Sequence, residues 1–283
     1  MNGWTEEPIL FQCGHERLVG VVHQAVGSRR STGVLIVVGG PQYRVGSHRQ
    51  FTLTARSLAS CGFPVMRFDC RGMGDSDGRF QGFEETGSDI AAAIKAFLGI
   101  VPAMDRVVLW GLCDAASAIL MHGHENPRVG GLILANPWVQ TESSEADSFL
   151  RHYYWRRIVQ RSFWIKLLKI RVNLRSSLGD WLGKIRAARS ADAPARFVER
   201  MLSGMNAFAG PVLILLSEHD LVARQFGDQC RATDEWRQAV GRGNVTVHHL
   251  ASADHTFSGR AALDAAMSAS LQWLSQSDTR PCR

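Results

Sequence analysis

The sequence lacks long hydrophobic runs. Its longest apolar stretches, 34–38 and 212–216, have the length of strands and are too short to span a bilayer, which takes about 20 apolar residues. The N-terminal residues also lack a basic stretch followed by a long apolar one, the pattern of a secretory signal. We therefore expect a cytoplasmic protein.

Paired cysteines and cofactor motifs are also missing. The six cysteines are scattered without a C-x-x-C pair, which predicts free thiols in a reducing compartment. His122 and His124 stand beside Glu125, but no further ligands follow at the spacing of a metal site, so we expect no metal. The Gly39-Gly40 pair has no GKS or G-x-G-x-x-G continuation, which argues against nucleotide binding. No cofactor is expected.

Net positive charge is confined to one segment. Residues 151–200 contain thirteen Lys and Arg against three acids, a net charge of +10, whereas the rest of the chain carries −4 of the total +6. This segment could be a solvated helical face, attract an acidic acyl carrier such as coenzyme A or a carrier protein, or contact anionic lipid. No nucleic-acid-reading motif accompanies the charge, so nucleic-acid binding is not expected.

Apolar strand-like runs alternate with helical stretches along most of the 283 residues. Strands are predicted near 9–11, 18–22, 34–38, 64–68, 106–110, 132–135, 212–216 and 245–250, and helices at 50–60, 89–98, 115–122 and 259–274. The central runs lack period-2 alternation, which predicts a mostly parallel sheet with helices on both faces, an α/β fold. The first two runs predict an antiparallel hairpin around Gly14.

Residues 137–210 break this rhythm because they contain no convincing strand and are too long for a simple crossover. Apolar residues recur there at helical spacing: Leu150, Tyr154, Ile158, Ile165, Leu168 and Val172. We expect a helical cap at 137–210, inserted between core segments 1–136 and 211–283.

The stretch VVLWGLCDAASAIL, 107–120, has the form of a nucleophile elbow with cysteine where serine is usual. In such a turn, small residues stand two positions before and two after the nucleophile, here Gly111 and Ala115 around Cys113. The turn places the side chain at a helix N-terminus, which predicts a lowered thiol pKa.

A base and an acid follow in the order that this architecture uses. Asp220 stands just past the strand 212–216, and His255 lies in a polar loop before the last helix. Glu218 is a rival acid two residues earlier. The predicted oxyanion donors are the backbone N–H of Asp114 and a second N–H from the loop that begins with Gly39 and Gly40, here called the glycine loop. Pro41 has no N–H, so the second donor is Gly40 or Gln42.

These motifs together resemble the α/β-hydrolase superfamily. The resemblance rests on the glycine loop, the elbow, the late Asp and His, and a D-x-R-G-x-G-x-S stretch with Asp69, Arg71, Gly72, Gly74 and Ser76. More narrowly, GGPQYRVGSHRQF, RFDCRGMGDSDG, GLCDAAS and ADHTFS are similar to the bacterial exosortase A system-associated hydrolase 1 family, whose genes accompany exopolysaccharide loci. The resemblance implies a hydrolase with a cysteine nucleophile.

The expected chemistry is attack by Cys113 on an acyl carbonyl, with His255 as base, Asp220 orienting it, and an acyl-thioester intermediate. Cysteine favours good leaving groups, so a small-molecule ester or thioester is the expected substrate. Two alternatives stay open. An alcohol or amine could take the acyl group, which makes an acyltransferase, or the fold could be a catalytically silent binding module.

Overall fold

The computed structural model describes residues 3–27, 30–40, 42–139 and 193–278. The chain divides into two compact units, one of residues 1–139 with 200–283 and one of residues 140–199. The cap predicted at 137–210 falls mainly on 140–192, outside the described residues, and so stays a prediction. The described part of that interval contains helix α7 (Ala193–Ala207).

The first unit is built on an eight-stranded sheet in the order β1-β2-β4-β3-β5-β6-β7-β8. The strands are β1 (Trp4–Cys13), β2 (Glu16–Ala25), β3 (Thr32–Val37), β4 (Val65–Phe68), β5 (Arg106–Leu112), β6 (Val129–Ala135), β7 (Val212–Ser217) and β8 (Val245–Leu250). β1 and β2 form the predicted antiparallel hairpin, and β2 pairs antiparallel with β4. From β4 to β8 every pair is parallel, which confirms the predicted mostly parallel sheet.

The central strands owe their burial to their sequence. β3 (TGVLIV) and β7 (VLILLS) are buried along their whole length, as expected for strands covered on both faces. β8 (VTVHHL) carries polar residues and is largely exposed because it forms one edge of the sheet.

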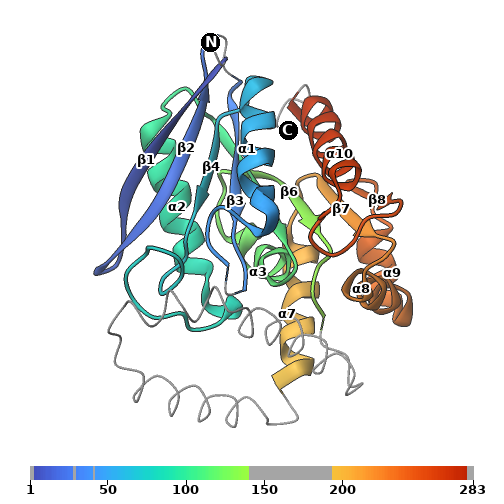
Figure 1. Ribbon diagram of the computed structural model, residues 1–283. Helices are drawn as coiled ribbons and strands as arrows, with labels where there is room; N and C mark the ends of the chain where they lie inside the picture. The colour runs from blue at the N-terminus through green and yellow to red at the C-terminus, as the bar shows by residue number, and fades with distance from the viewer. Residues whose placement is uncertain (1–2, 28–29, 41, 140–192, 279–283) are drawn as a thin grey trace, which may run out of the picture. The chain divides into compact units, whose positions relative to one another are not determined.

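Helices cover both faces of this sheet. The helices besides α7 are α1 (Gln50–Ser60), α2 (Gly87–Ile100), α3 (Asp114–His122), α8 (Leu221–Ala232), α9 (Asp234–Val240) and α10 (Arg260–Asp278). Figure 1 shows α1 and α10 in front of the strands and α2 behind them. Trp110 of β5 joins the front layer: its ring packs edge-to-face on Phe51 of α1 at 5.9 Å, and its Nε1 donates to Ser270 of α10 at 3.3 Å. Helices α8 and α9 were not predicted from the sequence.

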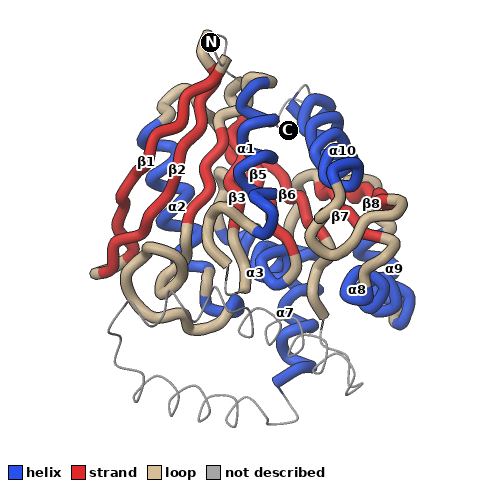
Figure 2. Tube along the Cα trace, viewed as in Figure 1, coloured by secondary structure: helices blue, strands red, loops and turns tan. Residues whose placement is uncertain are grey.

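The loops that follow the parallel strands carry the predicted site. Figure 2 shows the loops after β3 and β4 as tan tubes at the lower ends of those strands. Carboxyl ends of parallel strands meet at one edge of a sheet, where ligands commonly bind. In the described part of the chain, no helix has the length and apolarity needed to cross a membrane.

Candidate active site

Cys113 occupies a sharp turn between β5 and α3. Its backbone angles are φ 62° and ψ −125°, a strained conformation for a residue with a Cβ. Neighbouring strands and loops hold the turn in place. The Cys113 N–H donates to Ala135 O of β6 at 2.9 Å, and its carbonyl accepts from Ser117 N at 3.2 Å and from Trp138 N at 3.3 Å. Such a turn lifts the side chain out at the strand end.

Small residues on either side of Cys113 make this turn sterically feasible. A Cβ at Gly111 would lie 2.6 Å from Cδ1 of Ile119 and 2.9 Å from backbone atoms of Ala115 and Ala116, closer than Cβ atoms approach in proteins. Ala115 is itself buried, 2% exposed. The structure therefore explains the glycine and the alanine that the elbow pattern requires.

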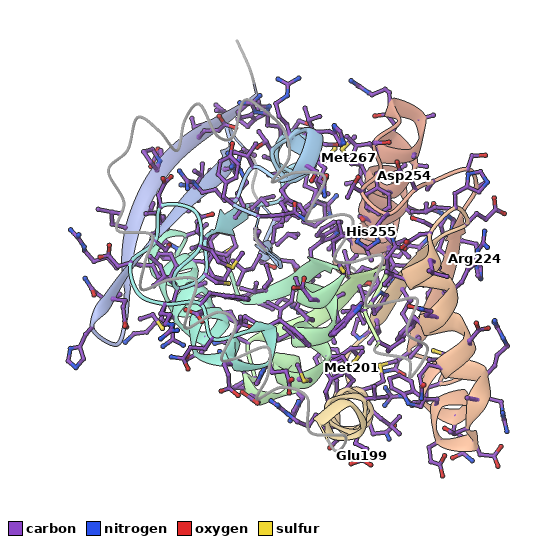
Figure 3. All side chains as sticks on the ribbon, turned by 60° about the horizontal axis from the view of Figure 1, so that its bottom comes forward. Glu199, Met201, Arg224, Asp254, His255 and Met267 are labelled. Atoms are coloured by element: carbon purple, nitrogen blue, oxygen red, sulfur yellow. The ribbon has the colours of Figure 1, made fainter. Side chains whose placement is uncertain are left out.

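His255 and Asp220 are brought together from loops 35 residues apart. The His255 Nδ1 lies 2.8 Å from the Asp220 Oδ2, and the Asp220 side chain is 1% exposed. Figure 3 labels His255 beside Asp254 on the loop before α10. Asp220 is also the N-cap of α8, because its two carboxylate oxygens accept from Val222 N and Ala223 N, each at 3.2 Å. One buried carboxylate thus orients the imidazole and begins a helix.

The thiol of Cys113 and the imidazole of His255 lie close enough for each to shift the pKa of the other. Burial raises the pKa of the Cys113 thiol above its ordinary value, although the hydrogen bond from His255 works in the opposite direction. This corrects the expectation of a lowered thiol pKa: desolvation outweighs the helix N-terminus. Burial alone would lower the pKa of His255, but the hydrogen bonds to Asp220 and Cys113 raise it well above its ordinary value.

Asn136, which the sequence analysis did not place in the site, ties three of its loops together. It is fully buried, with φ 43°, at the end of β6. Its Nδ2 donates to Ser217 Oγ at 3.0 Å and to the His255 carbonyl at 3.2 Å, and its Oδ1 accepts from Ser217 N at 2.9 Å. A polar residue directly after a buried strand was the only sequence signal for this role.

The predicted oxyanion residues lie on two segments in contact. Asp114 follows Cys113 at the start of α3, and its carboxylate accepts from the Gly40 N–H at 2.7 Å. The Gly40 N–H is therefore occupied by a side chain. The Gln42 side chain accepts from Ser47 N at 3.2 Å. Gln42 also lines a cavity of about 490 Å³, together with Tyr43, Gly72, Met73, Gly74, Asp75 and Phe80.

The remaining candidates lie elsewhere. Glu218, the rival acid, accepts from Ser252 N at 3.1 Å. His122 uses both ring nitrogens, on the Glu125 carboxylate and on the Glu84 carbonyl, each at 2.9 Å. Within the described ranges, no three His, Cys, Asp or Glu side chains gather as a metal site would require. In the loop after β4, Asp69 is buried and accepts from Arg44 N at 2.6 Å.

A buried acid, an imidazole and a thiol at a strand-to-helix turn form a chain that can move a proton. The Asp220 carboxylate lies 2.8 Å from the Nδ1 of His255. The Cys113 thiol is the second group that acts on the His255 ring. Beside the thiol, α3 begins at Asp114, and the first backbone N–H groups of a helix have no partner within the helix. This is the arrangement of a nucleophile, a base and an orienting acid.

Comparison with known proteins identifies the family of the chain. The family model described as serine aminopeptidase, S33, matches residues 31–258. The chain belongs to this family. It is an α/β hydrolase, although the family description names serine and this chain has Cys113 at the elbow. No curated protein matches the sequence.

Solved structures share the fold at low identity. The Pyrococcus furiosus esterase Pf2001 has a TM-score of 0.67 at 15% identity, covering 96% of this chain and 93% of its own. Est1E from Butyrivibrio proteoclasticus, solved with ferulic acid bound, has a TM-score of 0.65 at 12% identity, covering 96% and 100%. A proline iminopeptidase from Mycobacterium smegmatis has a TM-score of 0.58 at 15% identity, covering 96% and 99%. These similarities confirm the α/β-hydrolase fold.

Proposed function

We propose that this α/β hydrolase cleaves an ester or thioester through an acyl-thioester formed on Cys113. The observation that carries the proposal is the chain from Asp220 to His255 to Cys113 at the nucleophile elbow, with 2.8 Å between the Asp220 Oδ2 and the His255 Nδ1. A buried thiol with no chemical role would need neither a strained backbone nor an imidazole held by an acid.

The reaction runs in two steps. His255 takes the thiol proton as the Cys113 Sγ attacks the substrate carbonyl carbon, and the charge on the carbonyl oxygen is met by the Asp114 N–H and a second loop N–H. The tetrahedral intermediate then collapses: the C–S bond stays, and the alcohol or thiol leaves with the proton from His255. Water, deprotonated by His255, attacks the acyl-thioester and releases the acid and the free thiol.

The raised pKa of the Cys113 thiol supports a general-base mechanism, in which deprotonation accompanies attack. Because a thiolate is itself a good leaving group, the first intermediate returns to substrate unless the leaving group of the substrate is at least as good. Thioesters and activated esters therefore fit this site better than amides do. The fold similarity to the Pyrococcus furiosus esterase Pf2001 supports this substrate class.

Three finer predictions remain part of the proposal. The motif resemblance to the exosortase A system-associated hydrolases suggests an acyl group from exopolysaccharide metabolism. The basic segment 151–200 suggests a coenzyme A- or carrier-linked donor, or contact with anionic lipid. That segment lies mainly outside the described residues. Its last residue, Arg200, pairs with Glu84 at 2.9 Å.

The deciding experiment follows the acyl group on the protein. Incubation with p-nitrophenyl acetate and with acyl-thioesters should add one acyl mass to a peptide containing Cys113, with release of nitrophenol or thiol. Cys113→Ala should abolish both signals and keep the wild-type melting temperature. Hydrolysis that persists in Cys113→Ala contradicts the proposal, as does an acyl group found only on another cysteine.

The same assay separates the alternatives. An acyltransferase would give new ester or amide product that rises with added alcohol or amine, whereas a hydrolase gives acid at a rate that the acceptor does not change. A silent binding module would show no acyl-cysteine with any donor, and His255→Ala would then change nothing.

A further inference from the structure

The side chain of Asp114 makes contacts that the reaction above does not assign. One carboxylate oxygen accepts from the Gly40 N–H at 2.7 Å, and the other accepts from the Ala115 N–H at 2.9 Å. The first contact reaches across 74 residues of sequence, from the elbow to the loop after β3. The carboxylate thus fastens the glycine loop to the first turn of α3, next to the nucleophile.

The glycine loop is shaped to receive this carboxylate. A Cβ at Gly39 would lie 2.0 Å from the Asp114 Oδ1 and 2.7 Å from the Ala115 N, so no other residue fits there without displacing the acid. Gly40 adopts φ 59°, in the left-handed region that glycine tolerates best. Both glycines are therefore explained by the position of the Asp114 side chain.

Burial disfavours the ionised form of the Asp114 side chain. Burial raises the pKa of Asp114 to about 6, even though hydrogen bonds from Gly40 and Ala115 stabilise the charged form. An acid whose pKa is higher in the folded state than in the unfolded chain destabilises the fold once pH exceeds the unfolded value. A buried carboxylate with a raised pKa, next to a nucleophile, is typical of a functional site.

The contact also resolves which loop N–H is free to bind the oxyanion. The Gly40 N–H is taken by Asp114, and proline at position 41 has no N–H. The Gln42 N–H is the candidate that remains. Gln42 is anchored through its side chain on Ser47 and lines the cavity between the loops after β3 and β4.

We infer that Asp114 is a positioning residue: its carboxylate holds the Gly40 amide and thereby sets the loop so that the backbone N–H of Gln42 is the second oxyanion donor. This inference rests on the proposed function, because an oxyanion forms only if Cys113 is acylated. Its consequence is that loss of the Asp114 carboxylate slows acyl transfer to Cys113 without slowing reactions of the thiol that need no oxyanion donor.

Two reactions of Cys113 separate these effects. Acylation by p-nitrophenyl acetate passes through an oxyanion, whereas alkylation by iodoacetamide is a displacement at carbon and needs none. Asp114→Asn keeps the size of the side chain. It offers one acceptor oxygen in place of two, so its NH₂ group faces the N–H of either Gly40 or Ala115. Asp105→Asn, an exposed carboxylate removed in the same way, is the matched control.

For Asp114→Asn we expect acylation of Cys113 about tenfold slower or more, since loss of one oxyanion donor costs about 10²–10³ in rate. Alkylation should be no slower than in the wild type, because the charge of Asp114 raises the pKa of Cys113. The melting temperature above pH 6 should be unchanged or higher. Asp105→Asn should match the wild type in both reactions.

Several results would overturn the inference. Unchanged acylation in Asp114→Asn removes the positioning role, and faster acylation makes Gly40 the donor that Asp114 blocks. A lower melting temperature with equal slowing of acylation and alkylation makes the carboxylate purely structural. If the wild type forms no acyl-cysteine, both the proposed function and this inference fail, whereas normal acylation in Asp114→Asn refutes the inference alone.

Discussion

Replacing Asp220 should separate its two roles, because one carboxylate both orients His255 and caps α8. In Asp220→Asn, one side-chain oxygen can still accept from Val222 N or Ala223 N, so most of the cap survives. The amide NH₂, however, faces the His255 Nδ1, 2.8 Å away in the wild type. An NH₂ group cannot accept a hydrogen bond from Nδ1–H. The His255 ring therefore carries its proton on Nε2, which can then no longer take the thiol proton. Loss of an orienting acid in this way lowers kcat by about 10³- to 10⁴-fold.

Asp220→Ala removes the cap as well. Loss of an N-cap costs about 1 kcal/mol, which corresponds to about 2–4 °C in melting temperature for a chain of this size. We therefore expect both variants to lose activity and Asp220→Ala to melt lower than Asp220→Asn. The assay is nitrophenol release together with a thermal melt of each variant. Asp220→Asn with more than a tenth of wild-type kcat would refute this account of the site.

The stability of the pair should also depend on pH. Burial lowers the pKa of His255, but the hydrogen bond to Asp220 contributes to raising it in the folded state. The pair therefore stabilises the fold at pH values below the pKa of histidine in the unfolded chain, about 6.5. This stabilisation is lost as pH rises through the folded-state pKa. The gap in melting temperature between wild type and Asp220→Asn should therefore be larger at acidic than at alkaline pH. A gap that grows with pH would contradict the assignment.

Three further outcomes are expected. Asn136→Ala should lower the free energy of unfolding by about 2–4 kcal/mol, because it leaves the buried Ser217 N–H and the His255 carbonyl without partners; denaturant unfolding checks this, and a loss below about 0.5 kcal/mol contradicts it. Gly111→Ala should destabilise by about 1–3 kcal/mol, since its Cβ would lie 2.6–2.9 Å from atoms of α3; a wild-type melting temperature would show that the turn relaxes freely. Alkylation of Cys113 should keep accelerating above about pH 8.5 because burial raises the pKa of its thiol; a rate that levels off near neutral pH would indicate a preformed thiolate.

The alternation of apolar runs with helical stretches determined the sheet, because strands buried on both faces must be apolar throughout. The runs at 34–38 and 212–216 became the fully buried β3 and β7, and the helix predicted at 50–60 became α1 (Gln50–Ser60). The elbow could also be predicted from the sequence, because its turn requires small residues at the two positions that Gly111 and Ala115 occupy. Helices α8 and α9 were missed, although buried apolar residues recur in them at helical spacing, Val222 and Phe226 in α8 and Trp236 and Ala239 in α9.

What only the tertiary structure decided were the contacts between segments distant in sequence. The order of Cys113, Asp220 and His255 indicated a site, but the pairing of His255 with Asp220 depends on loops meeting at one edge of the sheet. The helix N-terminus predicted a lowered thiol pKa, yet burial reverses the sign, and burial is a property of the whole fold. The hydrogen bond of the Gly40 N–H to the Asp114 carboxylate, 74 residues away in sequence, likewise depends on the fold.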